Sequence, residues 1–298
     1  MTGPTGSVED ARRHFAEELR YVAPVRNNEA VVRAFAAVPR ERFLGPGPWR
    51  IFPSGHDGWI TADDDPRHLY HNVLVVIDAA RELNNGEPSL WAFLYDQVEI
   101  AAGERILHVG AGTGYYSAIL AEMVGLAGRV VAVEHDGGLA ARARANLAAW
   151  PQAEAVHGDG AAVDPGLVDL IIVNAGVTHP APVWLESLAP GGRLLLPLTA
   201  DDWWGAFLKV VRRPEGYAAA FVSRTGIFHC ASFRDPASAT RLRQAFARSR
   251  GRLPGIRSLR RDPEARDRSC WYHGPGFWLS KNPLPAEPDA PARRGSRA

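Results

Sequence analysis

The 298-residue chain has only two cysteines, Cys230 and Cys270, too few for a disulfide scaffold or a four-cysteine zinc site. It lacks any apolar run near the roughly 18 residues that a membrane-spanning helix needs. Its N-terminal stretch has no apolar core of the kind found in secretory signals. Neither sign of charge dominates, since 34 Lys and Arg face 33 Asp and Glu. These absences predict a cytoplasmic protein with no membrane partner, and the charge balance argues against a nucleic-acid partner.

Apolar residues recur at helical spacing near the start of the chain and follow alternating strand and helix patterns from residue 104 onward. The first pattern predicts two short helices, 9–20 and 28–37. The second is typical of βαβ units around a parallel sheet, closed by an antiparallel hairpin at 206–228. The predicted strands of the sheet are 105–109, 129–134, 153–159, 168–175 and 192–198, and the predicted helices between them are 115–125, 137–150 and 181–189.

Two segments fall outside these patterns. Residues 44–69 are rich in Gly, Pro and Asp, which predicts a long loop, and Trp49 and Trp59 suggest that this loop packs against something. Residues 241–268 carry ten arginines against three acidic residues. Such a run is most often a solvated surface, although it is also suited to binding an acidic peptide or a nucleic-acid backbone.

The most informative segment is ILHVGAGTGYYSAIL, residues 106–120, where a strand leads into Gly110, Gly112 and Gly114 and a helix begins at once. Glycine lets the backbone approach a ligand closely, and the free N–H groups of a helix N-terminus favour anions. Open α/β sheets bind their ligands at the carboxyl ends of such strands. The segment therefore predicts a nucleotide-type site, for NAD or for S-adenosylmethionine.

Spacing distinguishes these two cofactors. A dinucleotide fingerprint requires glycine where this chain has Tyr115, so the pattern favours S-adenosylmethionine, with Tyr115 beside its methionine part. Glu134 ends the second predicted strand, 24 residues after Gly110, and a carboxylate there can accept hydrogen bonds from both ribose hydroxyls. Asp159 and Gly160 follow the third strand, where Asp159 can accept from an adenine amino group.

These and neighbouring motifs resemble the protein-L-isoaspartate O-methyltransferase family, from about residue 30 to about residue 228. The resemblance implies an α/β fold: a Rossmann-like methyltransferase sheet with an N-terminal helical layer and a C-terminal antiparallel hairpin. It also implies methyl transfer from S-adenosylmethionine to a protein or peptide carboxylate. The motifs are VPRERF (38–43), Pro88 before a helix, ILHVGAGTGYYSAIL (106–120), VVAVE (130–134), GDG (158–160), VDLIIVNAG (168–176) and APGGRLLLPL (189–198).

Two positions depart from the family. The family has serine two residues before the proline, in the loop that holds the acceptor carboxylate, whereas this chain has Gly86, and Ser89 is the nearest substitute. The family's acidic residue before the glycine loop is His108 here. By resemblance we place Gly86, Pro88 and Ser89 at the acceptor and His108 at the cofactor. The cofactor-binding motifs match the family, whereas the acceptor-binding motifs diverge from it. This pattern suggests that the acceptor is a peptide modified in a biosynthetic pathway and not an aged protein under repair.

Methyl transfer to a carboxylate needs no strong base, because this nucleophile is already ionised at pH 7. Alignment and exclusion of water then supply the catalysis. We expect the free N–H groups of the helix that starts near Ser89 to face the acceptor, covered by the loop 44–69. His56, His68 and His71 are interpreted as solvated loop histidines, and no metal site is expected, since no metal-ligand spacing is present.

Other functions remain as alternatives. Amino-group methyltransferases of nucleic-acid bases carry an Asn/Asp-Pro-Pro-aromatic turn where this chain has Asn174-Ala175-Gly176-Val177, so that function ranks low. The glycine spacing disfavours an NAD oxidoreductase. Gly86 and His108 leave open a non-catalytic S-adenosylmethionine-binding module, or a methyltransferase of a different small-molecule acceptor.

The sequence thus divides into four parts. An N-terminal helical layer with a substrate-covering loop occupies residues 1–82, and the S-adenosylmethionine-binding methyltransferase domain occupies 83–230. A basic extension follows at 231–282. The Pro- and Arg-rich residues 283–298 are expected to form a disordered tail.

Overall fold

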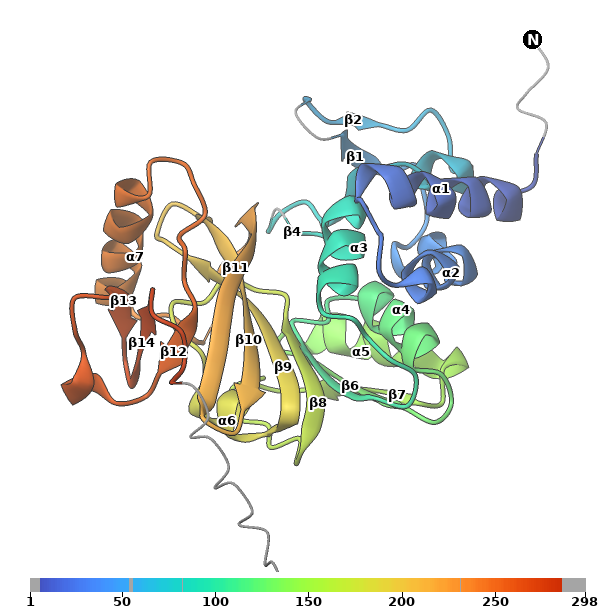
Figure 1. Ribbon diagram of the computed structural model, residues 1–298. Helices are drawn as coiled ribbons and strands as arrows, with labels where there is room; N and C mark the ends of the chain where they lie inside the picture. Colours follow the sequence, from blue (N-terminus) through green and yellow to red (C-terminus); the bar gives the residue numbers. More distant parts are fainter. Residues whose placement is uncertain (1–5, 54–55, 82, 231, 286–298) are drawn as a thin grey trace, which may run out of the picture.

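The computed structural model describes residues 6–53, 56–81, 83–230 and 232–285. Its centre is a ten-stranded sheet in the order β13-β14-β12-β11-β10-β9-β8-β5-β6-β7 (Figure 1). The five strands β5 to β9 pair in parallel, whereas the pairings from β9 through β10 to β13 are antiparallel. The predicted α/β fold, with a parallel sheet closed by a hairpin, is confirmed. The parallel strands are β5 (Arg105–Val109), β6 (Arg129–Glu134), β7 (Ala153–His157), β8 (Val168–Val173) and β9 (Leu188–Thr199), and the hairpin is β10 (Trp204–Arg213) and β11 (Gly216–Gly226).

Alternating side chains of the strands divide the core into two layers. Ile106 of β5 packs in the layer of α3 (Pro88–Gln97), α4 (Tyr115–Val124) and α5 (Gly137–Asn146). Leu107, the next residue, packs in the opposite layer with side chains of α6 (Pro182–Glu186) and α7 (Pro236–Arg248). Helices therefore cover both faces of the parallel strands, which explains why these strands are continuous apolar runs in the sequence.

The N-terminal layer contains the two helices expected from the sequence, α1 (Val8–Val22) and α2 (Glu29–Ala37). Ser7 and Asp10 form a capping box at the start of α1, and the Asn28 side chain caps α2. Helix α2 packs on α4, where Phe35 meets the ring of Tyr115 edge to face at 6.3 Å. The layer therefore rests on the helix that follows the glycine loop.

The prediction of a plain loop over 44–69 is wrong in part. Within that segment lie β1 (Arg50–Pro53), β2 (Trp59–Ile60) and a short 3-10 helix, Pro66–Leu69. The two strands join β3 (Val73–Asp78) and β4 (Leu83–Asn84) in a separate sheet of order β2-β1-β3-β4. Strands of two to four residues are too short to show a recognisable alternation, so their pairing depends on β3.

The basic extension contains the helix α7 and three strands that the sequence did not reveal. These strands, β12 (Ser258–Arg260), β13 (Cys270–Gly274) and β14 (Phe277–Ser280), lengthen the central sheet beyond β11. Arginines of this extension join it to the rest of the molecule: Arg261 pairs with Glu186 of α6 at 2.8 Å, and Arg243 pairs with Asp201 at 3.3 Å. These contacts favour a structural role for the basic run.

Two further expectations concern the ends and the membrane. The expected disordered tail lies, from residue 286 onward, outside the described residues. Across the ranges that the structure does describe, no helix combines the length and the apolar character needed to cross a bilayer.

Candidate active site

A cavity of about 700 Å³ opens at the carboxyl ends of the parallel strands. The chain leaves β5 toward β6 on one side and later returns to β8 on the other, so this edge is a topological switch point, the place where open α/β sheets bind ligands. Three segments supply most of the cavity lining: the strand ends with the glycine loop, the turn before α3, and the end of β11 with the residues that follow it.

The glycine loop is shaped by left-handed backbone at all three of its glycines. Gly110 has φ +79°, and a Cβ there would lie 3.1 Å from the carbonyl oxygen of Asn174. Gly112 has φ +58°, and an added Cβ would meet no heavy atom within 4 Å, so its missing side chain leaves open space beside the cavity. Gly114, at φ +94°, is the N-cap of α4. The loop therefore holds its backbone against an empty volume at a helix N-terminus.

Glu134 and Asp159 lie on the cavity wall after two neighbouring strands. The two oxygens of Glu134 accept from the backbone N–H groups of Gly112 at 2.7 Å and Asp136 at 3.0 Å. One oxygen of Asp159, Oδ1, accepts from Ala161 N–H and from the Ser232 hydroxyl, both at 2.9 Å. The other oxygen, Oδ2, accepts from no residue in the described ranges. Both carboxylates are thus fixed in place and keep lone pairs for a ligand.

Gly160, next to Asp159, is required by close packing. A Cβ at this position would lie 2.3 Å from the Cγ1 of Val109, at the end of β5. The backbone after the third parallel strand therefore crosses directly over the end of the first. Gly160 lines the cavity at this crossing, and its carbonyl accepts from the indole N–H of Trp184 at 2.8 Å.

His108 does not line the cavity, contrary to the prediction from its place before the glycine loop. It is fully buried on the α4 side of β5, and its Nδ1 lies 2.8 Å from the Ser117 hydroxyl. Strand alternation explains this orientation, since His108 shares a face with Ile106 and not with Val109. Burial lowers the pKa of the imidazole to about 4, so the ring is neutral near pH 7.

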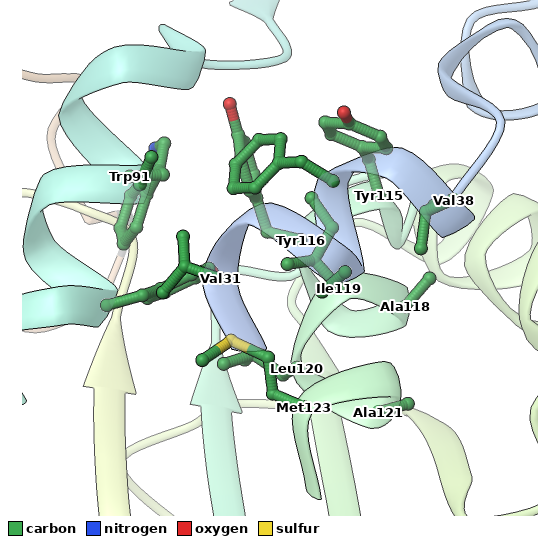
Figure 2. Close-up of a cluster of buried hydrophobic side chains, with 14 of the residues drawn as sticks. Val31, Val38, Trp91, Tyr115, Tyr116, Ala118, Ile119, Leu120, Ala121 and Met123 are labelled. Carbon is green, nitrogen blue, oxygen red and sulfur yellow. The ribbon is translucent and has the colours of Figure 1, made fainter. Parts of the chain in front are cut away.

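Tyr115 and Tyr116 begin α4 and both line the cavity. The Tyr116 hydroxyl donates to the Gly86 carbonyl at 3.1 Å, which ties the start of α4 to the turn before α3. The buried Tyr115 hydroxyl has no partner among the described residues, and burial raises its pKa. Figure 2 shows both rings in an apolar cluster that includes Val31 of α2 and Val38, the C-cap of that helix, with the two hydroxyl oxygens at the same end.

Of the three residues that the resemblance places at the acceptor, the structure puts one on the cavity wall. Gly86 lines the cavity, whereas Pro88 and Ser89 do not. The Ser89 N–H donates to Asn72 Oδ1 at 2.9 Å. This N–H of α3 is therefore not free to bind an anion, contrary to the expectation from the sequence. The carboxylate of Glu87, the N-cap of α3, also lines the cavity and accepts from Asn72 Nδ2 at 3.0 Å.

A buried arginine stands behind this wall. Arg40, within VPRERF, is fully buried and donates to the carbonyls of Leu69 and Val73 and to Asn85 Oδ1, at 2.8, 2.6 and 3.1 Å. No carboxylate of the described residues pairs with it. Asn85 also accepts from Val75 N–H at 3.1 Å, and its own Nδ2 has no partner there. An unpaired buried cation thus fixes a residue of the cavity wall.

Other lining residues were missed from the sequence, and some expected ones lie elsewhere. The missed segment is Thr225–Cys230 with Ser232, which closes one side of the cavity after β11. Arg81 was also missed; it spans the mouth to pair with Asp136 at 2.5 Å. Trp49 and Trp59, expected to cover the site, do not line the cavity. Nothing in local periodicity marks the segment after β11, because its position depends on the hairpin register.

The loop histidines lie away from the cavity. His56, His68 and His71 are absent from its walls, and His68 Nε2 lies 2.9 Å from Asp63 Oδ1 in an ordinary surface contact. Within the part of the chain that the structure describes, no three His, Cys, Asp or Glu side chains are grouped to hold a metal ion.

Comparisons with known proteins point to one family. A family model described as protein-L-isoaspartate(D-aspartate) O-methyltransferase matches residues 64–225. The chain is similar to a protein-L-isoaspartate O-methyltransferase of Ignicoccus hospitalis, 28% identical over 215 residues that cover 70% of this chain and 92% of the relative. It is 30% identical to an enzyme of the same name from Rhodopseudomonas palustris, over 64% of this chain and 80% of the relative.

A solved structure shares the fold. It comes from Plasmodium falciparum and is described as the same type of methyltransferase in complex with S-adenosyl-L-homocysteine. The TM-score is 0.57 at 17% identity, and the match covers 73% of this chain and 97% of that chain. The similarity supports a methyltransferase sheet.

Proposed function

The chain belongs to the protein-L-isoaspartate O-methyltransferase family, and on that premise we propose that it transfers a methyl group from S-adenosylmethionine to a carboxylate of a protein or peptide. The observation that carries the proposal is the cavity at the switch point, where the glycine loop, Glu134 and Asp159 lie together. The matched residues, 64–225, include all of these groups.

The cavity fits S-adenosylmethionine. The open space beside Gly112 can receive a ligand against bare backbone, and Tyr115 closes the same wall. Glu134 would accept from the ribose hydroxyls and Asp159 Oδ2 from the adenine amino group, because both keep acceptor capacity. When bound, the cofactor supplies a methyl group on a positively charged sulfur. A nucleophile that attacks the methyl carbon in line with this sulfur displaces the sulfur.

The chain's own task is then to hold an ionised carboxylate against that methyl group in a dry site. No general base is required, because an acceptor carboxyl group is ionised at pH 7. The main contribution that the protein can make is to position the two reactants. Well-oriented intramolecular reactions show that positioning alone can accelerate a reaction by a large factor. The turn before α3 is the part of the cavity wall suited to it, since Gly86 lies there beside the start of α4.

Cofactor binding is the first experiment. Isothermal titration with S-adenosylmethionine should show binding by the wild type, and Glu134→Ala should weaken it by roughly 1–3 kcal/mol, the range for a hydrogen bond to a charged group. An unchanged affinity in this variant would remove the ribose assignment. A wild type that does not bind the cofactor would contradict the proposed function as a whole.

Transfer is the second experiment. Methyl-labelled S-adenosylmethionine is incubated with an isoaspartyl-containing peptide, its aspartyl isomer, and the same peptides with their carboxyl groups amidated. We expect label in the free-acid peptides and none in the amidated ones. Preference for one free acid decides between the repair-type acceptor and another peptide carboxylate. Cofactor binding without any transfer would favour the non-catalytic binding module.

We also propose that the protein acts in the cytoplasm on a protein or peptide partner and not on nucleic acid. Cys230 and Cys270 are both free thiols, as is usual in a reducing compartment. The arginines of the basic run that contact Glu186 and the Trp271 carbonyl are engaged within the fold, which argues against a dedicated surface for a nucleic-acid backbone.

A further inference from the structure

Trp91 is a buried residue whose indole N–H has no acceptor among the described residues. Its side chain is 1% exposed, it lies in the first turns of α3, and it lines the cavity. Its indole N–H donates to none of the described residues, whereas the other buried cavity tryptophan, Trp184, donates to the Gly160 carbonyl. Buried indole N–H groups ordinarily find an acceptor. An unmet donor on a cavity wall therefore indicates a ligand atom at that place.

The indole nitrogen lies where the side chain of residue 86 would otherwise be. A Cβ built on Gly86 would lie 2.8 Å from Trp91 Nε1 and 3.1 Å from Tyr116 Cε2. Gly86 also has φ +79°, which disfavours residues with side chains. The family's serine therefore cannot occupy position 86 while Trp91 keeps this position. Glycine at 86 and tryptophan at 91 depend on each other.

Neighbouring rings hold the indole in one orientation. Trp91 packs against Tyr116 at 5.3 Å, Tyr95 at 5.7 Å and Phe207 at 5.7 Å between ring centroids. Figure 2 shows the indole nitrogen at the same end of the cluster as the hydroxyl oxygens of Tyr115 and Tyr116. Tyr116 in turn follows the glycine loop and bonds to the Gly86 carbonyl. The donor is thus fixed beside the start of α4, at the loop that faces the cofactor site.

A buried positive charge lies behind this wall and favours an anion there. The buried Arg40 guanidinium holds Asn85, and Asn85 keeps its Nδ2 group unpartnered among the described residues. The carboxylate of Glu87 lines the same cavity, but it accepts from Asn72 Nδ2 and is exposed enough to be solvated. A fixed, unpaired cation in a region of low dielectric is screened less than a solvated carboxylate.

We propose that the indole N–H of Trp91 donates a hydrogen bond to the acceptor carboxylate and takes over the role of the serine that this chain lacks at position 86. The inference rests on the proposed function. The donor binds one oxygen of the acceptor carboxylate while the other oxygen forms the new bond to the methyl carbon. As that bond forms, the bond between the methyl carbon and the cofactor sulfur breaks, and its electron pair stays on sulfur.

Trp91→Phe tests the proposal because it keeps a ring and removes the N–H. With labelled S-adenosylmethionine and the better of the isoaspartyl and aspartyl peptides, KM for the peptide should rise about ten- to a hundred-fold, the range for hydrogen bonds to charged groups. Cofactor affinity by calorimetry should stay within two-fold. Trp150→Phe is the matched control, since its indole N–H donates to Glu122 at 2.7 Å, away from this cavity, and its peptide KM should not change.

A second variant blocks access to the indole N–H and leaves Trp91 itself unchanged. Gly86→Ala puts a methyl group 2.8 Å from Trp91 Nε1 and leaves the indole present, so it should also raise the peptide KM. Gly103→Ala is its control: φ there is +83° and an added Cβ meets nothing within 4 Å, so it carries similar backbone strain far from the site. Its peptide KM should match the wild type.

The outcomes separate this inference from the proposed function. If the wild type methylates neither free-acid peptide, the proposed function fails and the inference fails with it. If the wild type transfers label while Trp91→Phe and Gly86→Ala keep the wild-type peptide KM, only the inference is overturned. If peptide KM and cofactor affinity change together in Trp91→Phe, the indole has a structural role and the inference is likewise overturned.

Discussion

The two sides of the cavity are formed by different kinds of structure. The side that we propose for the cofactor consists of backbone and carboxylates at the ends of adjacent parallel strands, in the glycine loop, Glu134 and Asp159. The side that we propose for the acceptor is built from a turn, Gly86, and from side chains brought there by packing, Trp91 and Asn85. The first side agrees with the family motifs, and the second replaces a serine by a glycine beside a tryptophan. The part of the cavity set by strand ends keeps the family pattern, and the part set by side-chain packing departs from it.

Filling the space beside the glycine loop should have the largest effect. Gly112→Leu places a side chain in the open volume next to Glu134, so we expect S-adenosylmethionine affinity to fall a thousand-fold or more, or about 4 kcal/mol. Gly103→Leu is the matched control, because it has the same left-handed backbone with open space at the opposite edge of the sheet. Titration calorimetry on both variants measures the difference. Equal losses in both would mean that strain, and not occupancy of the site, is responsible.

Adding a negative charge to the proposed acceptor wall should have the next largest effect. Asn85→Asp keeps the acceptors for Arg40 and Val75 N–H but places a carboxylate beside the cavity. The buried ion pair with Arg40 should keep the fold intact, while the added charge and the lost Nδ2 donor should raise the peptide KM about thirty-fold, roughly 2 kcal/mol. Steady-state kinetics with the acceptor peptide and cofactor titration measure the two sides separately. Weakened cofactor binding with unchanged peptide KM would reverse our assignment of the two sides.

His108 should affect stability and not binding. Its folded-state pKa is lowered to about 4, against about 6.5 when unfolded, so the unfolded chain binds more protons between these pH values. The folded state therefore loses stability as pH falls from about 6.5 toward 4, by roughly 2 kcal/mol between pH 7 and pH 5. Urea unfolding of the wild type and of His108→Gln at both pH values should show a larger loss in the wild type, because the variant keeps only the other histidines whose pKa values burial lowers, His179, His229 and His273. An identical pH slope in the variant would contradict the buried neutral ring.

The contact between the two sides should have the smallest effect. Arg81, from the turn after β3, pairs with Asp136 at the start of α5 across the cavity mouth. Both side chains are partly exposed, so the pair is worth at most about 1 kcal/mol. Arg81→Ala should raise the cofactor dissociation rate by no more than about five-fold, and less so at high salt. A rate increase of a hundred-fold in stopped-flow measurements would instead identify Arg81 as a main cofactor ligand.

The parts of this molecule that could be predicted from sequence are those set by local spacing. The glycines, Glu134 and Asp159 occupy strand ends, and parallel pairing brings strand ends to one edge whatever the details of packing. His108 was misplaced although alternation along β5 already assigns it to the α4 face. That error came from weighing a motif position above strand geometry.

Apart from Gly86, the wall that we propose for the acceptor depends on tertiary packing and could not be predicted from the sequence. Arg40 lies 45 positions before Asn85 in the chain, and no spacing rule connects them. Trp91 resembles an ordinary core residue of a helix until its nitrogen is seen beside Gly86. The strands β12, β13 and β14 are three to five residues long and acquire their pairing only from the edge of the completed sheet.

The central claim is that the acceptor is a carboxylate, and the chemistry of the product tests it most directly. Labelled peptide from the transfer reaction is divided, and one half is held in mild base before the label is counted. A methyl ester releases its label as methanol under these conditions, whereas a methylated amine retains it. We predict loss of the label in base and its retention at acid pH. Label that survives the alkaline treatment would contradict carboxylate methylation and would make an amino group the acceptor.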